Sequence, residues 1–427
     1  MEVRPFYILV ELILVLAWMV LESMDDNLGG AEEKSSVGRL FLPSIAFSYF
    51  ATGPLGVLVS LLLIDIGETF GVSEGVMGQV NTLYSIVAVV FALLMGILSL
   101  RFKHKLLLLT GLLFISISAL GCLVAPNFIL MIVSYSLSGL GWAMVSPMCV
   151  TFIGEYFSLE KRAGAIGWII AGGALSYAIG APIIALTASL GGWRFAIIGF
   201  VIPVLIGSLL LASVGLPSIS HSRRQPTSNG KTYLRSFKAV LSGRSAIACL
   251  IGDALRSASF IAILIYGISF FRKRFLVSID FASILLLGAA LCCTLGSLVS
   301  GPVVNRFGRK TSTVLTAFLA GILVITYTCV PSLWLSLALN LVDSWFFGMV
   351  TSAANALTLE QIPEFRGTMM SVDTAALNLG SAFGTAFGGL ALLSFDYEGL
   401  GIVLGVMGVA AAVVFHFLTT DPTRKKN

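Results

Sequence analysis

Three charged side chains interrupt apolar stretches of this sequence, where a charge is costly. Asp253 and Arg256 stand three residues apart within residues 245–271, and Asp343 stands within residues 333–358. The three-residue separation puts Asp253 and Arg256 on one face of a helix. A neighbouring cation holds one carboxylate ionised, while another carboxylate in a dry site can titrate. These residues indicate proton exchange or pairing with a solute at Asp253 or Asp343, with Arg256 as counter-charge; the alternative is a permanent ion cluster that only fixes two helices.

The composition identifies the solvent around these charges. Of 427 residues, 57% are hydrophobic and 11% are charged, and the mean hydropathy is +0.98. A soluble domain carries about 25% charged residues, so lipid must cover much of this chain. The six cysteines fall in apolar runs without metal-ligand spacing, and only three histidines are present. We therefore expect no metal site and no cofactor.

Apolar runs of about 20 residues predict membrane helices. Twelve such runs occur, at about 40–64, 80–100, 106–125, 129–153, 165–190, 195–216, 245–271, 281–303, 311–330, 333–358, 368–394 and 399–418. Asp253 and Arg256 then lie roughly 12–17 Å from one end of the seventh run, and Asp343 lies roughly 15 Å from the opposite end of the tenth. All three approach the middle of the bilayer.

Lysine and arginine concentrate in alternate loops. We assign 20 of the 26 basic residues to loops on one side, which the positive-inside rule makes cytoplasmic. Both ends of the twelve-helix body are then cytoplasmic, in the cell membrane. The net charge of +5 follows from this topology and does not indicate a nucleic-acid partner. Four basic residues fall outside, and three of them are adjacent without an explanation in the sequence: Arg194, Arg272, Lys273 and Arg274.

Polar stretches divide the chain into parts. Residues 6–21 are apolar and precede an acidic stretch, and we interpret them as a peripheral extra helix, with a thirteenth span or a signal-like segment as alternatives. We predict an N-terminal extra helix and acidic linker at residues 1–39, followed by a six-helix bundle at 40–217. A cytoplasmic linker at 218–244 then leads to a second six-helix bundle at 245–419 and a cytoplasmic tail at 420–427.

The two bundles repeat each other at an offset near 205 residues. Gly96 and Arg101 follow the second span, as Gly301 and Arg306 follow the eighth. After the fourth and tenth spans, an acidic residue precedes an arginine: Glu155 and Arg162, then Glu360 and Arg366. A parallel repeat of this kind places a substrate site between the halves near the bilayer midplane.

The second-half loop carries a specific resemblance. Its pattern Gly301-x-x-x-Asn305-Arg306-x-Gly308-Arg309-Lys310 resembles the signature of the major facilitator superfamily, although Asn305 replaces the usual acid. Glu155-x6-Arg162, Gly192-Trp193-Arg194 and Gly180-Ala181-Pro182 also resemble family motifs, the last that of efflux members. The resemblance implies an all-α membrane fold of two six-helix bundles related by a pseudo-two-fold axis, with spans one, four, seven and ten around a central cavity. Tyr135 stands where proton-coupled efflux members have an arginine.

Further candidate residues fall into two groups. Neutral polar side chains that could face the cavity are Ser48, Thr52, Tyr84, Ser138, Trp142 and Asn355. Small hydroxyl residues also serve helix packing, so that alternative stays open. A cytoplasmic gate is expected from the matched loops, with Arg101 and Arg306 clamped to carboxylates or helix ends; plain topology determination is the alternative. The gate candidates are Gly96, Arg101, Glu155, Arg162, Gly301, Arg306, Arg309, Glu360, Arg366 and Asp373.

These features favour a secondary active transporter that works by alternating access. The resemblance implies a monomer that carries a small molecule, with proton-coupled efflux of a drug-like, sugar or metabolite substrate as the leading hypothesis. An uncoupled facilitator and a receptor or scaffold that does not transport are the alternatives. An enzyme is not expected, because no metalloprotease His-Glu-x-x-His run or Gly-x-Ser-x-Gly elbow occurs.

Overall fold

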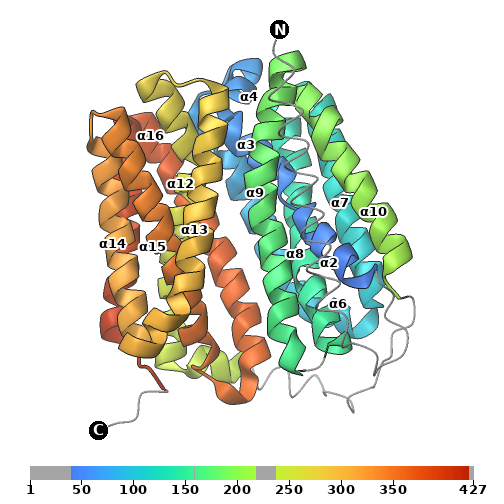
Figure 1. Cartoon of the computed structure of the whole chain (residues 1–427), viewed down its shortest axis with the longest axis vertical. Helices are drawn as coiled ribbons and strands as arrows, with labels where there is room; N and C mark the ends of the chain where they lie inside the picture. The colour runs from blue at the N-terminus through green and yellow to red at the C-terminus, as the bar shows by residue number, and fades with distance from the viewer. Residues whose placement is uncertain (1–39, 158, 218–236, 423–427) are drawn as a thin grey trace.

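A computed structural model of the chain describes residues 40–157, 159–217 and 237–422. Most of these residues are helical, and no strand occurs among them. The predicted extra helix at residues 6–21, and residues 218–236 of the linker, lie outside this part of the chain. Figure 1 shows the long helices side by side in two groups, one formed by the earlier part of the sequence and one by the later part.

The helices follow one another with short connections. The first half contains α2 (Phe41–Phe50), α3 (Pro54–Leu61), α4 (Leu63–Phe70), α5 (Glu74–Met77), α6 (Gln79–Arg101), α7 (His104–Val124), α8 (Phe128–Tyr156), α9 (Leu159–Ala196), the π-helix η1 (Ile197–Val201) and α10 (Ile202–Gly215). The second half contains α12 (Arg244–Phe275), α13 (Ile279–Phe307), α14 (Arg309–Cys329), α15 (Leu333–Leu359), the 3₁₀-helix η2 (Pro363–Phe365) and α16 (Arg366–Leu418).

The number of membrane spans agrees with the sequence. Ten helical segments are long and apolar enough to cross a membrane within the described residues. Two of them are interrupted by non-helical backbone, one at Gly191 and Gly192 and the other at Asp396. Gly192 has φ +77° and Asp396 has φ +59°, so each break turns the chain back. Counting each interrupted segment as two gives the predicted twelve spans and confirms the fold class.

The first span differs from the single predicted helix at 40–64. It is divided into α2 and α3 at residues 51–53, and α4 extends it to Phe70. Pro54 is the first residue of α3, where its missing N–H leaves no helical hydrogen bond unmade. The division therefore follows from the proline, which the apolar run did not reveal.

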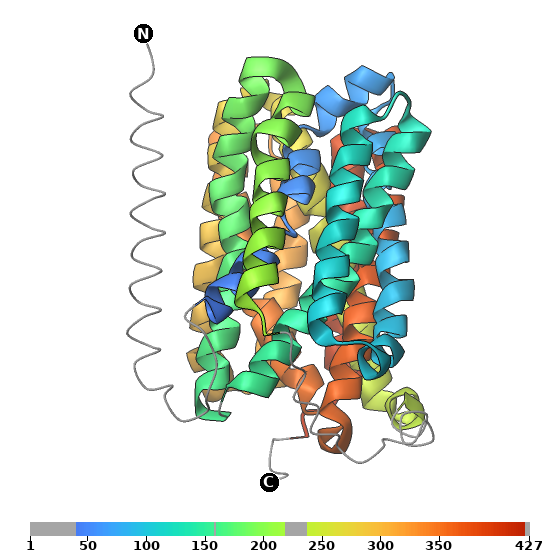
Figure 2. The ribbon, with the colours of Figure 1, turned by 90° about the vertical axis from the view of Figure 1, so that its right-hand side faces the viewer.

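The bundle has two ends that matter for the site. We call the end where α10 finishes and α12 begins the linker face, and the opposite end the far face. The breaks in α9 and α16 lie at the far face, together with α4 and α5, as the turned view in Figure 2 shows for α4. The predicted orientation makes the linker face cytoplasmic.

Matched lysines confirm the repeat in three dimensions. Lys105 Nζ donates hydrogen bonds of 2.7 and 2.6 Å to the carbonyl oxygens of Ser213 and Leu216, where the last helix of the first half ends. Lys310 Nζ donates a 2.8 Å hydrogen bond to the carbonyl oxygen of Thr419, where the last helix of the second half ends. A cation satisfies the unpaired carbonyls of a helix C-terminus. Each signature loop is thus tied to the final helix of its own half.

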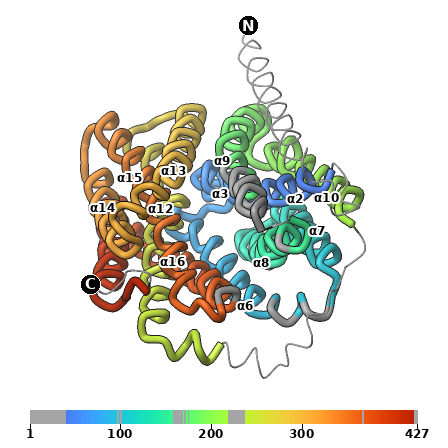
Figure 3. The backbone as a smooth tube through the Cα atoms, turned by 60° about the horizontal axis from the view of Figure 1, so that its bottom comes forward, coloured from blue at the N-terminus to red at the C-terminus, as the bar shows by residue number. Residues whose placement is uncertain are grey.

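Glycines let the helices around the charged residues approach closely. Gly380 and Gly384 on α16 lie against the backbone of Ala254 and Ala258 on α12, where an added Cβ would collide with carbonyl oxygens. This approach fixes α12, which carries Asp253 and Arg256, against α16. Between the halves, α6 packs on α16 and α9 packs on α13, and the view from the linker face in Figure 3 shows both pairs side by side.

We expect Gly380→Leu to destabilise the second half, because the new side chain must push α12 and α16 apart. Overpacking of this kind costs roughly 1–3 kcal/mol or more. Thermal unfolding of the detergent-purified protein measures the effect as a lower Tm. Gly267→Ala on α12 is the matched control, since the nearest outside atom to its added Cβ is 4.0 Å away. An equal loss in both variants would contradict the close-contact explanation.

Candidate functional site

Asp253 and Arg256 form a buried ion pair on one face of α12, as their spacing predicts. Arg256 donates from Nε at 3.0 Å and from Nη2 at 2.8 Å to Asp253 Oδ1, and Thr358 donates to Asp253 Oδ2 at 2.8 Å. Arg256 also donates from Nη1 to Thr351 Oγ1 at 3.0 Å. Asp253 is 0% exposed and Arg256 5% exposed. Both oxygens of Asp253 therefore have hydrogen-bond partners.

Asp373 completes this group from α16. It is 0% exposed and lies within hydrogen-bonding reach of Asp253 and within electrostatic reach of Arg256. Neither of its oxygens has a hydrogen-bond partner among the described residues, since two ionised carboxylates cannot donate to each other. With both carboxyls ionised, the group of Asp253, Arg256 and Asp373 would carry one net negative charge. The sequence did not predict this placement, and the gate role of Asp373 stays a prediction.

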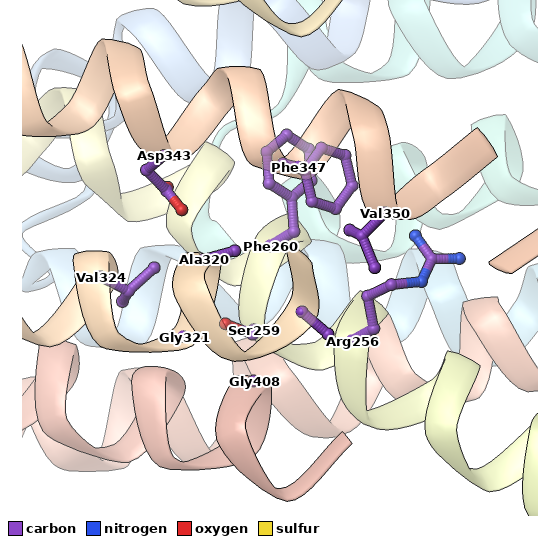
Figure 4. A pocket seen from close by; sticks show the side chains of 11 residues that line it. Arg256, Ser259, Phe260, Ala320, Gly321, Val324, Asp343, Phe347, Val350 and Gly408 are labelled. Carbon is purple, nitrogen blue, oxygen red and sulfur yellow. The ribbon is translucent and has the colours of Figure 1, made fainter. Parts of the chain in front are cut away.

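Asp343 stands apart from the cluster on α15. It is 2% exposed, and it lines a small cavity within the second half together with Arg256, Ser259, Phe260 and Phe347. The cavity volume of about 20 Å³ accommodates about one water molecule. Figure 4 shows the stacked rings of Phe260 and Phe347 between Asp343 and Arg256. Asp343 forms no ion pair among the described residues, although it shares this cavity with Arg256.

The predicted hydroxyl stripes of the first half bond to their own helices. Ser48 donates to the carbonyl of Ser44 at 2.7 Å, Thr52 to that of Tyr49 at 2.7 Å, and Ser138 to that of Tyr135 at 2.5 Å. These hydrogen bonds support the packing alternative for the three residues. On α15, Asn355 differs, because its Oδ1 is buried and has no partner in the described part of the chain.

Aromatic residues gather in the same half. Tyr84 packs against Tyr135 with ring centroids 5.5 Å apart, and Trp142 packs against Tyr49 at the same distance. Tyr177 on α9 is an electrostatic neighbour of Tyr49, Tyr84 and Tyr135. The sequence reasoning selected Tyr84 and Trp142 but passed over Tyr49, Tyr135 and Tyr177. The available signal was one tyrosine in each of four spans.

The linker face carries its ion pairs within each half. His104 Nδ1 lies 2.9 Å from Glu155 Oε1, and Arg309 Nη1 lies 3.8 Å from Glu360 Oε1. Arg306 is exposed and its guanidinium lies over the Phe307 ring, so the expected clamp from Arg306 to a carboxylate is not formed in this structure.

Two glycines of the second signature loop serve different purposes. Gly308 has φ +88°, a conformation that favours glycine at the start of α14. Gly301 has open space around it. The remaining gate candidates are Gly96, Arg101, Arg162 and Arg366, whose surroundings lie outside the side chains that the structure describes.

The far face explains the unexpected basic run at the end of α12. Arg272 forms a two-pronged ion pair with Asp65 on α4, with Nη2 to Oδ1 at 3.2 Å. Lys273 Nζ lies 2.8 Å from Glu74 Oε1 on α5. Both pairs join the second half to the first. Arg274 stays within its own half, where it contacts Glu398 at 3.0 Å.

Hydrogen bonds reinforce this closure deeper in the bundle. Tyr266 donates from its hydroxyl to the carbonyl of Thr385 at 3.0 Å and lies 3.4 Å from that of Gly75 in the other half. Asn81 and Ser85 on α6 both donate to Ser381 Oγ on α16, at 3.1 and 3.0 Å. Among the described residues, the ion pairs between the halves all lie at the far face. The structure is therefore closed at that end.

Two six-helix bundles, joined at one end and carrying buried charge in one half, define a polytopic membrane transporter. The sequence profile of the Major Facilitator Superfamily matches residues 42–276 and 256–427. The chain belongs to this superfamily, whose members transport solutes and are not enzymes.

Several relatives of known or assigned name are similar to this chain. An uncharacterized MFS-type transporter, YceJ, of Bacillus subtilis (strain 168) is 26% identical over 362 residues, which cover 82% of this chain and 88% of the relative. A protein named probable sugar efflux transporter of Helicobacter pylori (strain P12) is 24% identical over 414 residues, covering 91% and 96%. The sphingosine-1-phosphate transporter SPNS2 of Xenopus tropicalis is 28% identical over 196 residues, covering 44% and 37%.

Solved structures share the fold. A bacterial homolog of the human lysosomal transporter Spinster, in an inward-facing and unoccupied conformation, superposes with a TM-score of 0.69 at 17% identity and covers 89% of this chain and 95% of that one. The nucleoside transporter NupG superposes with a TM-score of 0.73 at 15% identity, covering 89% and 100%.

The buried cluster gives opposite expectations for its two carboxyls. Asp253→Asn leaves the Arg256 guanidinium uncompensated, so we expect a loss of stability of roughly 3–5 kcal/mol. Asp373→Asn keeps a hydrogen-bond donor toward Asp253 and leaves the Asp253–Arg256 pair intact, so stability should change by less than about 1 kcal/mol. Chemical unfolding of the two purified variants measures the difference. Equal losses would contradict the assignment of the ionised carboxyl to Asp253.

The far-face ion pairs should bias the protein toward this closed arrangement. Removing one such pair by Asp65→Asn weakens the closure by about 1 kcal/mol, or roughly fivefold in population. Labelling of an engineered cysteine near Tyr266 with a membrane-impermeant maleimide should then become faster. Glu398→Gln breaks the pair to Arg274 inside one half and serves as the control. Restored protection in the swapped variant Asp65→Arg with Arg272→Asp would support the pairing; unchanged labelling in Asp65→Asn would contradict it.

Proposed function

We propose that this protein moves a small solute across the cell membrane by alternating access and couples this movement to protons. The observation that carries the proposal is the buried group of Asp253, Arg256 and Asp373 beside the isolated Asp343. Charges inside a membrane bundle are costly and mark functional sites by default. Two carboxyls that share one cation need one proton for neutrality, so the cluster is suited to bind and release a proton.

The roles of the carboxyls follow from their partners. Asp253 is held by Arg256 and Thr358 and acts as the fixed anion. Asp373 and Asp343 lack such partners among the described residues and are the groups that we assign to proton exchange. Movement of a proton changes the charge of a site packed between α12, α15 and α16, and thereby the preference for one arrangement of the halves.

The cycle needs the halves to close at alternate ends. The far-face pairs of Arg272 and Lys273 hold the present arrangement, and they must break when the far face opens. The signature loops at the linker face, together with Glu360 that pairs with Arg309, are positioned for the opposite closure. We assign the first half to residues 40–217 and the second to 245–419, with a monomer as the working unit and both ends of the body cytoplasmic.

The direction that we propose is efflux. Its support is the run Gly180-Ala181-Pro182, which resembles the motif of efflux members, and the name of the Helicobacter pylori relative. A drug-like compound, a sugar or a metabolite fits this reading. Uncoupled facilitated transport is the competing function. It is favoured because both oxygens of Asp253 have partners, as expected for an ion pair that only stabilises the bundle and exchanges no proton.

Transport in proteoliposomes with an imposed pH gradient tests the coupling. The solute panel contains drugs, sugars and amino acids, and the wild-type protein should accumulate its solute against a gradient when protons flow the other way. Asp373→Asn and Asp343→Asn cannot exchange a proton at these positions, so each should lose the response to the gradient while keeping solute exchange at equal pH.

Asp280→Asn is the control, because Asp280 is an exposed acid in the first turn of α13. Its response to the gradient should equal that of the wild-type protein. Wild-type transport that ignores the gradient would establish the facilitator instead.

A further inference from the structure

The first half contains phenol groups whose hydrogen-bonding capacity is unused. Tyr84, Tyr135 and Tyr177 are electrostatic neighbours, and in the described part of the chain none of their hydroxyls makes a hydrogen bond. Tyr135 is only 3% exposed. Tyr84 and Tyr177 are only partly buried, and none of the three hydroxyl oxygens is among the fully buried polar atoms that lack a partner. Hydroxyls that make no hydrogen bond within the protein are normally satisfied by a water or a ligand.

The contrast with neighbouring hydroxyls strengthens this observation. Ser48 and Ser138 each donate to a carbonyl of the preceding turn of their own helix, and Thr52 donates to the carbonyl of Tyr49. A phenol cannot fold back onto the preceding turn in this way, because its hydroxyl lies too far from its own backbone. The three free phenols therefore present donors and acceptors to whatever occupies the space beside them.

An apolar surface lies next to these groups. The Trp142 indole and the Tyr49 ring pack together from α8 and α2 and are both partly exposed. Glycine makes room around the cluster: Gly173 lies against the Tyr49 ring, and Gly56 lies near the Tyr135 hydroxyl, where an added Cβ would be 3.7 Å away. Aromatic faces bind the flat or ring-shaped faces of ligands, and Tyr and Trp combine this contact with a polar edge.

No formal charge accompanies the cluster. Residues 41–61, 79–100, 128–154 and 169–190, which carry it, contain no Asp, Glu, Lys or Arg. An ionised solute would enter this space without a counter-charge, which is strongly unfavourable inside a membrane. The buried charges Asp253, Arg256 and Asp343 all belong to the other half.

We infer that Tyr84, Tyr135, Tyr177 and the Tyr49–Trp142 pair form the first-half wall of the substrate site, and that its ligand is an uncharged ring compound with hydroxyl groups. The ring face lies on the aromatic pair, and its hydroxyls exchange hydrogen bonds with the three phenols. This inference rests on the proposed transport function and specifies the substrate class. It separates substrate recognition in the first half from proton exchange in the second.

Equilibrium binding to the full-length protein in detergent tests the site without any gradient. The probes are 4-nitrophenyl β-D-glucopyranoside and 4-nitrophenyl β-D-glucuronide, which differ by a carboxylate in place of a hydroxymethyl group. Isothermal titration calorimetry should give binding of the glucoside and at least roughly tenfold weaker binding of the glucuronide. Comparable binding of both probes, or no binding of the glucoside, would overturn the inference.

Single hydroxyl deletions locate the binding. Tyr84→Phe, Tyr135→Phe and Tyr177→Phe should each weaken glucoside binding by roughly fivefold to tenfold, because each removes one hydrogen bond to the ligand and keeps the ring. Tyr156→Phe removes a phenol at the linker end of α8 and should leave the affinity unchanged. Size-exclusion profiles confirm that the variants are folded. Wild-type affinity in the triple Phe variant would also overturn the inference.

The experiments can contradict proton coupling and the first-half substrate site independently of each other. Absence of glucoside binding alongside a pH-gradient response that depends on Asp373 would leave proton coupling intact and remove the site. Binding that depends on the three phenols, without a response to the gradient, would support the site and identify the protein as a facilitator.

Discussion

Inside a bilayer, every polar group must find its partner within the protein, and this requirement organises the whole molecule. The backbone meets it through continuous helices, with breaks confined to positions such as Pro54 and Gly192 at or near helix ends. Small hydroxyl side chains meet it by bonding to their own helices. The groups that do not meet it include, among the described residues, carboxyls in the second half and phenols in the first.

These two places have different chemistry. In the second half, Asp373 and Asp343 are carboxyls without a full set of partners, next to the satisfied pair of Asp253 and Arg256. In the first half, the groups without a hydrogen bond to the described protein include the neutral phenols of Tyr84, Tyr135 and Tyr177. The repeat that relates the halves thus preserved their packing and their loops while their interiors diverged. Separate sites for the proton in the second half and for the solute in the first are consistent with this divergence, because each ligand then contacts only groups that can bind it.

Local patterns in the sequence predicted the fold well. Apolar runs gave twelve spans, and the Gly191–Gly192 break lies where the sequence indicated a turn. Contacts between distant segments were harder to predict. The basic run at the end of α12 had no explanation until folding brought Asp65, 207 residues away, beside Arg272.

The position of Asp373 shows the same difficulty. Spacing along the chain did not predict that the close approach of α16 to α12 through Gly380 brings this part of α16 against the helix that carries Asp253. Tyr49, Tyr135 and Tyr177 were passed over for a related reason. Their proximity depends on the packing of four helices, which no spacing along the chain encodes.

The lysines of the two signature loops have a mechanical consequence. Lys105 and Lys310 each bind the carbonyl end of the last helix of their half, so the third and sixth spans of each bundle are joined at the linker face. A bundle joined in this way rotates as one rigid body. The ion pairs of Arg272 and Lys273 lie at the far face, at the opposite end of the bundle from this junction, so a small rotation there separates the paired charges by a large distance.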